Sequence, residues 1–368
     1  MKTLLVVPSV AKFGKEEEVA DDLHPTMDYT ALARTLRAVP GDQADMLDYA
    51  DVDSDTDRMV GLVRKFAGRD AALALMAFQR RHQYDVIFTN SESVSVPLAL
   101  LLKTAKRRPR HVTIGHHLST EKKHPFFRWL NVQREIDVIF VYASTQLEFA
   151  RDYLGIPAAQ LRLIPFHADH RFYRPLAHVA ARENQICAAG LEWRDYPTLI
   201  DAVSELTDLS VRLAAASPWS KHGNETEQRV LPPHVQARRY DYRELRELYA
   251  ESAFVVVPLY DNDFQAGITT ILEAMAMGKA VIVTSTQGQN DVIVDGQNGL
   301  YVPPGSVEGW RSAIDRLRND PALRARLGQR ARGWIEENAT LDHWVEHMVA
   351  ALHDRPEPAR HTASEIAA

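Results

Sequence analysis

The sequence contains one cysteine, Cys187, among 368 residues, so no disulfide can form within the chain. A lone thiol is usual in proteins of a reducing compartment, and we therefore expect a cytoplasmic protein. No apolar run reaches the roughly 18 residues that a membrane-spanning helix needs. The N-terminal apolar run is interrupted by Pro8 and by charges from Lys12 onward. It predicts a first buried strand rather than a signal peptide.

Several catalytic motifs are also missing. The chain has no GxSxG turn of a serine hydrolase, no GxGxxG after the first strand and no P-loop. Its histidines at positions 111–124 and 167–170 lack the cysteines or the HExxH pattern of zinc sites, so we expect no metal requirement. The net charge of −6 argues against a nucleic-acid partner.

The length of the chain and its apolar content of 45% predict two domains of about 150 to 180 residues each. Short apolar runs alternate with helical patterns, which predicts parallel, doubly wound sheets of the α/β class. The expected strands lie at residues 3–7, 86–89, 111–114, 138–142 and 161–165, and then at 185–189, 211–215, 254–258, 280–284 and 299–302.

Polar residues and a proline separate these two series of strands. We expect an N-terminal domain over residues 1–175, a linker over 176–184 and a C-terminal domain over 185–337. A last helix is expected over 338–353. The tail at 354–368 has few apolar anchors and is expected to be mobile.

The most informative stretch runs from Asp261 to Gly305 and reads as loop, helix, buried strand, turn and second strand. The first turn of this helix offers unpaired N–H groups and a positive dipole end, which favour an anion such as a diphosphate. Gly267 lets a ligand approach the main chain closely. Glu273 lies roughly 12 Å along the helix from Gln265, where its carboxylate can accept hydrogen bonds from ribose hydroxyls.

This order and spacing resembles the donor site of the retaining glycosyltransferases of family 4, also called glycosyl transferases group 1. The resemblance covers the 45 residues from Asp261 to Gly305. It implies the GT-B fold, with two doubly wound, Rossmann-like parallel-sheet domains facing across a crevice, and a C-terminal helix that packs back on the first domain. It also implies transfer of a hexosyl group from a nucleotide-diphosphate sugar, with retention of configuration and no cofactor beyond this co-substrate.

Two positions depart from the family pattern. The family has two glutamates separated by seven residues, and Gln265 replaces the first, which faces the transferred sugar. A neutral hydrogen bond contributes about 0.5 to 1.5 kcal/mol, against roughly 1.5 to 3 for a charged one. The family's usual donor sugar therefore cannot be assumed for this chain. Of the two basic residues that bind the diphosphate, Arg194 matches one and Leu191 replaces the other.

The resemblance assigns the candidate catalytic residues, and the position of loops beyond the carboxyl ends of strands assigns the acceptor pocket. His116 and His117 follow the strand HVTIG, where the family carries a histidine that faces the sugar, and they join Gln265 as candidate catalytic residues. The loops after the first two strands of the sheet supply an acceptor pocket. The candidates for donor binding are Arg194, Ala266, Gly267, Ile268, Thr269, Thr270 and Glu273, and those for the acceptor pocket are Lys12, Gly14, Lys15, Asn90 and Glu92.

Several alternatives stay open. The acceptor is a small molecule, a saccharide or a lipid-linked molecule, and the oligomeric state is not indicated. Basic residues beside Phe126, Phe127 and Trp129 suggest either peripheral membrane contact or, as we favour, a core-facing helix with a basic rim. A nucleotide-sugar epimerase and a non-catalytic sugar-nucleotide-binding protein are the two competing functions.

Overall fold

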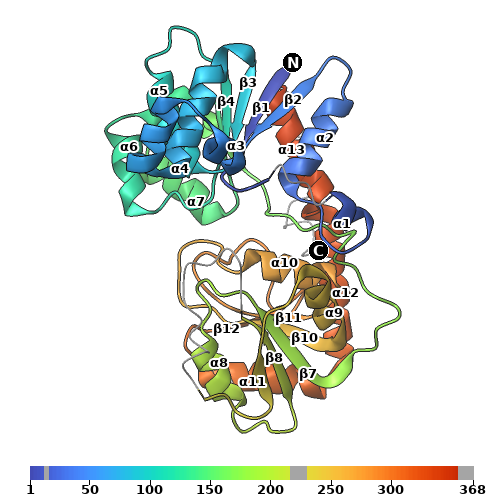
Figure 1. Cartoon of the computed structure of the whole chain (residues 1–368). Coiled ribbons are helices and arrows are strands. Elements are labelled where there is room, and N and C mark those ends of the chain that lie inside the picture. Colours follow the sequence, from blue (N-terminus) through green and yellow to red (C-terminus); the bar gives the residue numbers. More distant parts are fainter. Residues whose placement is uncertain (12–15, 216–229, 355–368) are drawn as a thin grey trace. The chain divides into compact units, whose positions relative to one another are not determined.

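A computed structural model describes residues 1–11, 16–215 and 230–354 (Figure 1). It divides into two units. The first contains residues 1–17, residues 27–164 and the C-terminal helix from Trp344 onward, and the second contains residues 18–26 and 165–343. Within the described ranges, no helix combines the length and the apolar composition needed to cross a bilayer.

The first unit is built on a parallel sheet with the strand order β2-β1-β3-β4-β5-β6. Nearly every residue of its central strands is buried, as expected for a sheet covered on both faces. The strands are β1 Lys2–Val6, β2 Gln43–Leu47, β3 Val86–Thr89, β4 Arg110–Gly115, β5 Val138–Val141 and β6 Leu161–Leu163.

Helices cover this sheet and link its strands (Figure 1). One core lies where α4 and α5 pack on β1 and β3, and a second lies where α5 and α6 meet β5. The helices are α2 Asp28–Ala38, α3 Tyr49–Ser54, α4 Arg58–Arg80, α5 Glu92–Leu102, α6 His124–Arg128, α7 Ser144–Glu148 and α13 Leu341–Leu352, whereas α1 Glu16–Ala20 begins in this unit and ends in the second. Short turns of helix are η1 Arg81–Gln83, η2 Glu121–Lys123, η3 Val132–Glu135, η4 Phe149–Tyr153 and η5 Ala158–Gln160.

The second unit repeats this plan with the strand order β12-β11-β10-β7-β8-β9, again with all pairs parallel. Its strands are β7 Arg182–Ala189, β8 Ser210–Ala214, β9 Val235–Ala237, β10 Ser252–Val257, β11 Val281–Thr284 and β12 Leu300–Val302. Its helices are α8 Tyr196–Val203, α9 Tyr242–Glu251, α10 Ile268–Ala276, α11 Val307–Asn319 and α12 Pro321–Asn338.

Both strand orders contain a switch point, where consecutive connections leave in opposite directions. In the first sheet it lies between β1 and β3, and in the second between β7 and β10. Ligands of doubly wound sheets bind beyond the carboxyl ends of the strands at such a point. The loops after β1, β3, β7 and β10 are therefore the places to look for a site.

The prediction of two doubly wound parallel sheets is confirmed. The strands β2 and β9 were not predicted, because QADML and VQA are short edge strands whose apolar residues are interrupted by polar ones. The chain passes between the units after Ile164, whereas the sequence suggested residue 175. The expected helix at 338–353 runs from Leu341 to Leu352, and residues 355–368 of the expected tail lie outside the described residues.

Candidate functional site

The switch point of the second unit holds a buried arginine between two glycines. Gly190, just after β7, has φ 96°, and Gly267, before α10, has φ 75°; both angles favour glycine. A Cβ atom at Gly190 would lie 2.4 Å from Nη2 of Arg194, and one at Gly267 would lie 3.2 Å from its Nη1. The glycines therefore allow the Arg194 guanidinium to reach the start of α10.

Every hydrogen bond of Arg194 goes to a neutral group. Its Nε donates to the carbonyl of Ala189 and its Nη1 to that of Glu192, both at 2.8 Å, and its Nη2 donates to Oγ1 of Thr270 at 3.2 Å. The side chain is 6% exposed and forms no ion pair with any described residue. Burial lowers the pKa of Arg194 from its ordinary value, because the charged form is poorly solvated.

A cation in this position lies beside a second source of positive potential. The first N–H groups of α10 have no acceptor within the helix, and the helix dipole adds partial positive charge at the same end. A buried charge without a partner is costly. The loop after β7 and the start of α10 thus form a place where an anion would be stabilised from both sides.

The predicted donor-binding residues around α10 play different parts. Ala266 is buried, and its carbonyl accepts a hydrogen bond from Nε2 of Gln289. Ile268 is also buried, while Thr269 is exposed at the first turn. Oγ1 of Thr270 is committed to Arg194 and to the carbonyl of Ala189 at 3.3 Å. What these four residues share is that their main-chain atoms form the start of α10.

Gln265 precedes this helix and has an unsatisfied acceptor. Its Nε2 donates to Oδ2 of Asp291 at 3.5 Å, whereas its Oε1 is buried without a hydrogen-bond partner among the described residues. Asp291 lies on the loop after β11, which packs closely on the loop before α10 because Gly288 donates to the carbonyl of Asn262 at 3.2 Å. A carboxylate therefore stands beside the glutamine that replaces the family's glutamate.

The sequence did not single out Asp291, although the residue lies in the informative stretch. No periodicity marks a polar residue in a loop, and only the packing of two loops brings Asp291 to Gln265. The polar cluster QGQND after a buried strand was the signal available.

Glu273 lies on α10 among aromatic hydroxyls. Oη of Tyr249, from α9, donates to its Oε2 at 3.0 Å. Burial raises the pKa of Glu273 to about 7, although Tyr249, Tyr173 and the charge of Arg194 act in the opposite direction. Part of the residue remains accessible to solvent. The carboxyl group can therefore change its protonation state near neutral pH.

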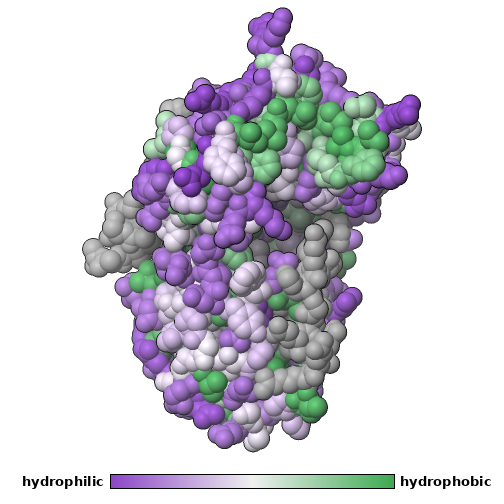
Figure 2. Space-filling model, turned by 90° about the vertical axis from the view of Figure 1, so that its left-hand side faces the viewer, coloured by the Kyte–Doolittle hydropathy of each residue, from purple (hydrophilic) through white to green (hydrophobic). Residues whose placement is uncertain are grey.

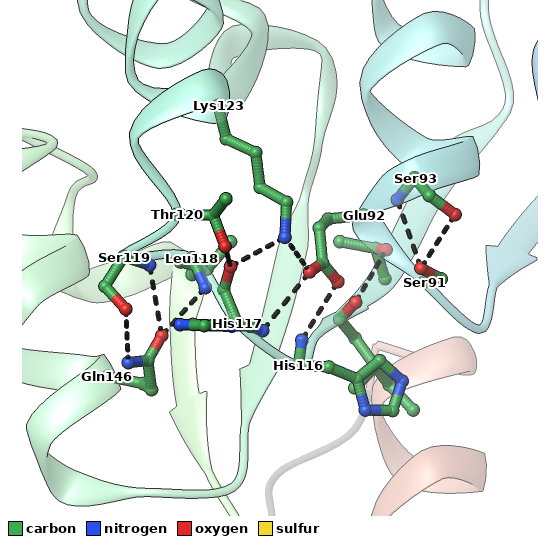
Figure 3. A network of polar contacts seen from close by, with 12 residues as sticks. Ser91, Glu92, Ser93, His116, His117, Leu118, Ser119, Thr120, Lys123 and Gln146 are labelled. Atoms are coloured by element: carbon green, nitrogen blue, oxygen red, sulfur yellow. Dashed lines mark hydrogen bonds and ion pairs between the residues drawn. The ribbon is translucent and has the colours of Figure 1, made fainter. Parts of the chain in front are cut away.

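In the first unit, Glu92 clamps the loop that carries the predicted histidines (Figure 3). Its carboxylate accepts hydrogen bonds from the main-chain N–H groups of His116 at 3.0 Å and His117 at 3.2 Å, and it pairs with Nζ of Lys123. Lys123 also donates to the carbonyl of His117 at 2.6 Å. Glu92 was expected to line an acceptor pocket, but its oxygens are directed at this loop.

The lowered pKa of Glu92 agrees with its role as a clamp. Burial alone would raise the pKa of Glu92, but the charges of His116 and Lys123 and the main-chain hydrogen bonds outweigh it and lower the pKa to about 2. On the other side of the loop, Oε1 of Gln146 accepts hydrogen bonds from Leu118 at 2.7 Å and Ser119 at 3.3 Å (Figure 3). The loop after β4 is thus fixed at both ends.

The two histidines differ in exposure. The His116 ring is exposed at the carboxyl ends of β3 and β4, with Nε2 3.1 Å from the carbonyl of Asn90 and its centroid 5.5 Å from that of Tyr142. His117 is partly buried. Oδ1 of Asn90 is buried without a partner among the described residues, which leaves an acceptor near His116. The exposed His116 ring and Asn90 therefore lie together at the carboxyl ends of β3 and β4.

The other predicted acceptor residues, Lys12, Gly14 and Lys15, lie outside the described residues. Within the described part of the chain, no three side chains of His, Cys, Asp or Glu come together in a group that could hold a metal ion.

Comparison with known sequences gives a consistent pattern. The family model for glycosyl transferases group 1 matches residues 183–320. An alpha-D-kanosaminyltransferase of Streptomyces kanamyceticus is 38% identical over 262 residues, which cover 66% of each chain. A D-inositol 3-phosphate glycosyltransferase of Stackebrandtia nassauensis is 25% identical over 65% of this chain. The chain spans 59% of the length of that second relative.

Comparison with solved structures concerns the fold alone. Sucrose-phosphate synthase from Thermosynechococcus elongatus superimposes with a TM-score of 0.73 at 18% identity, over 96% of this chain and 99% of the other. HepE of Anabaena, solved in complex with UDP-glucose, gives a TM-score of 0.71 at 16% identity, over 96% and 99%. The two units of this chain have the GT-B fold.

Proposed function

This chain belongs to the glycosyl transferases group 1 family, and we propose that it transfers a hexosyl group from a nucleotide-diphosphate sugar to an acceptor hydroxyl with retention of configuration. The observation that carries the proposal is the buried Arg194 guanidinium, which has no carboxylate partner among the described residues and lies at the start of α10. A diphosphate supplies the negative charge that this place lacks.

The neighbouring residues suit the rest of a sugar nucleotide. Glu273 accepts hydrogen bonds from ribose hydroxyls in its ionised form. The buried Oε1 of Gln265 and the carboxylate of Asp291 are acceptors for sugar hydroxyls or for an amino group. HepE, whose fold this chain shares, has been solved with UDP-glucose, and the kanosaminyltransferase is named for a sugar transfer. The first supports a sugar nucleotide as donor, and the second supports the transfer of a sugar.

In the proposed reaction, the bond between the anomeric carbon and the diphosphate oxygen breaks, and a bond to the acceptor oxygen forms on the same face. The acceptor's proton passes to the departing diphosphate. Arg194 and the N–H groups of α10 stabilise the negative charge that grows on the diphosphate, and this stabilisation lowers the barrier. His116, fixed by the Glu92 clamp, orients the acceptor hydroxyl.

The test begins with the donor. Melting of the full chain is followed in the presence of UDP, GDP, ADP and dTDP sugars, because a ligand that binds the native state raises the melting temperature. We expect one nucleotide to raise it and its sugar conjugate to be transferred to an acceptor or slowly hydrolysed. If none of these conjugates binds or reacts, the proposal is wrong.

The same incubation separates the competing functions. A nucleotide-sugar epimerase would convert the donor into an isomer without any acceptor, and a non-catalytic relative would bind the donor and leave it intact. Analysis of the nucleotide sugar by chromatography distinguishes isomerisation, cleavage and no change. Free nucleoside diphosphate, appearing together with a glycosylated product, is the outcome that supports the transferase.

A further inference from the structure

The first half of α4 exposes an apolar stripe. Met59, Leu62 and Phe66 are 57%, 52% and 75% exposed, and their spacing of three and four residues places them on one side of the helix. Val60 and Val63, on the neighbouring side of the helix, pack into the core with α5. The helix is interrupted at Gly68, with φ 87° and ψ 176°, directly after the stripe. The stripe is thus not the core face of α4.

A second apolar group lies on and after α6. Phe127 is buried and anchors this short helix, whereas Trp129 is 78% exposed and Leu130 45% exposed. Tyr153 is 46% exposed and lies under the guanidinium of Arg128, at 4.8 Å from its ring centroid. Of the three aromatic residues that the sequence pointed to here, Phe126 and Phe127 therefore belong to the core and Trp129 to the surface.

Helix α5 connects the two groups. It packs against α4 on one side and against η3, next to α6, on the other. Nζ of Lys103, at the end of α5, donates to the carbonyl of Leu130 and holds the Trp129 loop in place. Figure 2 looks onto this side of the molecule and shows apolar side chains gathered over the first unit. We call the exposed side chains of Met59, Leu62, Phe66, Trp129, Leu130 and Tyr153 the α4–α6 face.

The exposed apolar residues of the first unit are concentrated here. Apart from the α4–α6 face, Val10 is the only large apolar side chain that is exposed among the described residues of this unit. Scattered exposed apolar residues are normal, but a group of them marks a place of interaction.

Basic side chains predominate in the segments that carry this face, although carboxylates such as Glu121 and Asp152 also lie there. Between residues 58 and 69, and between 103 and 110, every charged side chain is basic, in a chain whose net charge is −6. Some of these cations are neutralised locally, as Arg64 and Arg69 are by Asp53. Others form no ion pair with any described residue, namely Arg58, Lys65, Lys106, Arg107, Lys122 and Arg128.

We propose that the α4–α6 face docks on an anionic lipid bilayer. Lysine and arginine side chains can lay their apolar stems along such a surface while their charges reach the headgroups. Trp129 suits the boundary between headgroups and acyl chains, and Phe66 suits shallow insertion. A second copy of the chain would bring unpaired cations against each other, which makes self-association through this face unfavourable. The inference does not depend on the transfer reaction.

Vesicle sedimentation of the full chain tests the inference. Vesicles of phosphatidylcholine with phosphatidylglycerol should bind the protein, vesicles of phosphatidylcholine alone should bind it at least about tenfold more weakly, and added salt should release it. The double variant Phe66→Ser with Trp129→Ser should bind anionic vesicles at least about tenfold more weakly. The variant Lys65→Gln with Arg128→Gln should reduce binding in the same direction.

The matched control is Arg326→Gln with Arg330→Gln, which removes two exposed cations of α12 and should leave vesicle binding unchanged. All variants should keep the nucleotide-induced rise in melting temperature, which separates this inference from the proposed function. Equal binding to both kinds of vesicle, or no effect of the Phe66 and Trp129 substitutions, would overturn it. So would a dimer in light scattering that these substitutions dissociate.

Discussion

At the scale of single residues, a buried charged side chain of the first unit and one of the second differ in their hydrogen-bond and ion-pair partners. Glu92 is saturated, because a lysine and two main-chain N–H groups surround its carboxylate. Arg194 is equally buried but meets only neutral acceptors among the described residues. Saturation is typical of a structural role and an incomplete set of partners is typical of a ligand site. Of the two, only Arg194 needs something from outside the chain.

The raised pKa of Glu273 predicts a pH dependence of nucleotide binding. The carboxyl is protonated below its pKa of about 7 and ionised above it, and the ionised form accepts stronger hydrogen bonds from ribose. We expect nucleotide affinity to rise about fivefold to tenfold between about pH 6 and 8, as measured by calorimetry. Glu273→Gln should bind weakly and without this dependence. The same slope in this variant would assign the titration to another group.

Glu273 should also affect stability, with the opposite pH trend. Its pKa in the folded state lies above the ordinary value of 4.5, so its contribution is complete below about pH 4.5 and is lost as the pH rises through about 7. Glu273→Gln cannot ionise and should lose less stability over that range. Urea unfolding of the two proteins at several pH values measures the difference.

The contribution of Glu92 to stability has the opposite pH dependence to that of Glu273. Its pKa of about 2 lies below the ordinary value of 4.5, so its contribution to stability is present above about pH 4.5 and is lost as the pH falls through about 2. Glu92→Gln breaks the buried pair with Lys123 and should cost about 3 to 5 kcal/mol in the free energy of unfolding at neutral pH. The control Glu121→Gln, on the same loop but exposed, should cost less than about 0.5 kcal/mol. Equal values would mean that the clamp contributes nothing.

At the scale of elements, α10 was the best-predicted part of the molecule. The apolar spacing of ITTILEAMA identified the helix, and Gly267 was expected to let a ligand approach the main chain before it. By contrast, nothing in the periodicity of α4 distinguishes Met59, Leu62 and Phe66 from core residues, because an apolar stripe has the same spacing on either side of a helix. Only the tertiary structure shows which side of each helix packs against the core and which side is exposed.

Alanine substitutions at Gly267 and Gly296 separate the effect of backbone strain from the effect of contacts made by the new Cβ atom. Both have a positive φ, at 75° and 73°, and replacement by alanine should cost about 1 to 2 kcal/mol of stability at either position. Only at Gly267 would the new Cβ also meet neighbours, at 3.0 Å from Cγ1 of Val257 and 3.2 Å from Nη1 of Arg194. Gly267→Ala should therefore weaken nucleotide binding, whereas Gly296→Ala should not. Equal affinities in the two variants would remove the start of α10 from the site.

At the scale of the whole molecule, the sequence predicted two doubly wound sheets but not where each segment belongs. Residues 18–26 follow β1 in the chain yet pack in the second unit, where Asp22 pairs with Arg174 and Arg246. Thr26 donates from its main chain to Asp169 at 2.8 Å in the same unit. These partners are far apart in sequence, and no local pattern connects them. Parallel sheets could be argued from the alternation of strands and helices, but long-range ion pairs could not.

The same reason explains which candidate site residues the sequence could name. Arg194, Gln265 and Glu273 follow from a motif with fixed spacing. Asp291 and Tyr249 come from other loops and helices and required the packing of the second unit. Lys123 was visible only as one of several cations, and its partner Glu92 lies 31 positions away.

The central claim is that the Arg194 guanidinium and the start of α10 hold the diphosphate of a sugar nucleotide. Calorimetric titration of the nucleotide that most stabilises the protein tests it most directly. Arg194→Gln should lower the affinity about tenfold to a hundredfold, Arg194→Lys should retain part of it, and Arg326→Gln should bind like the unmodified chain. Unchanged affinity in Arg194→Gln, with the fold verified by circular dichroism, would contradict the claim. If that variant does not fold, unchanged affinity in Arg194→Lys would contradict it instead.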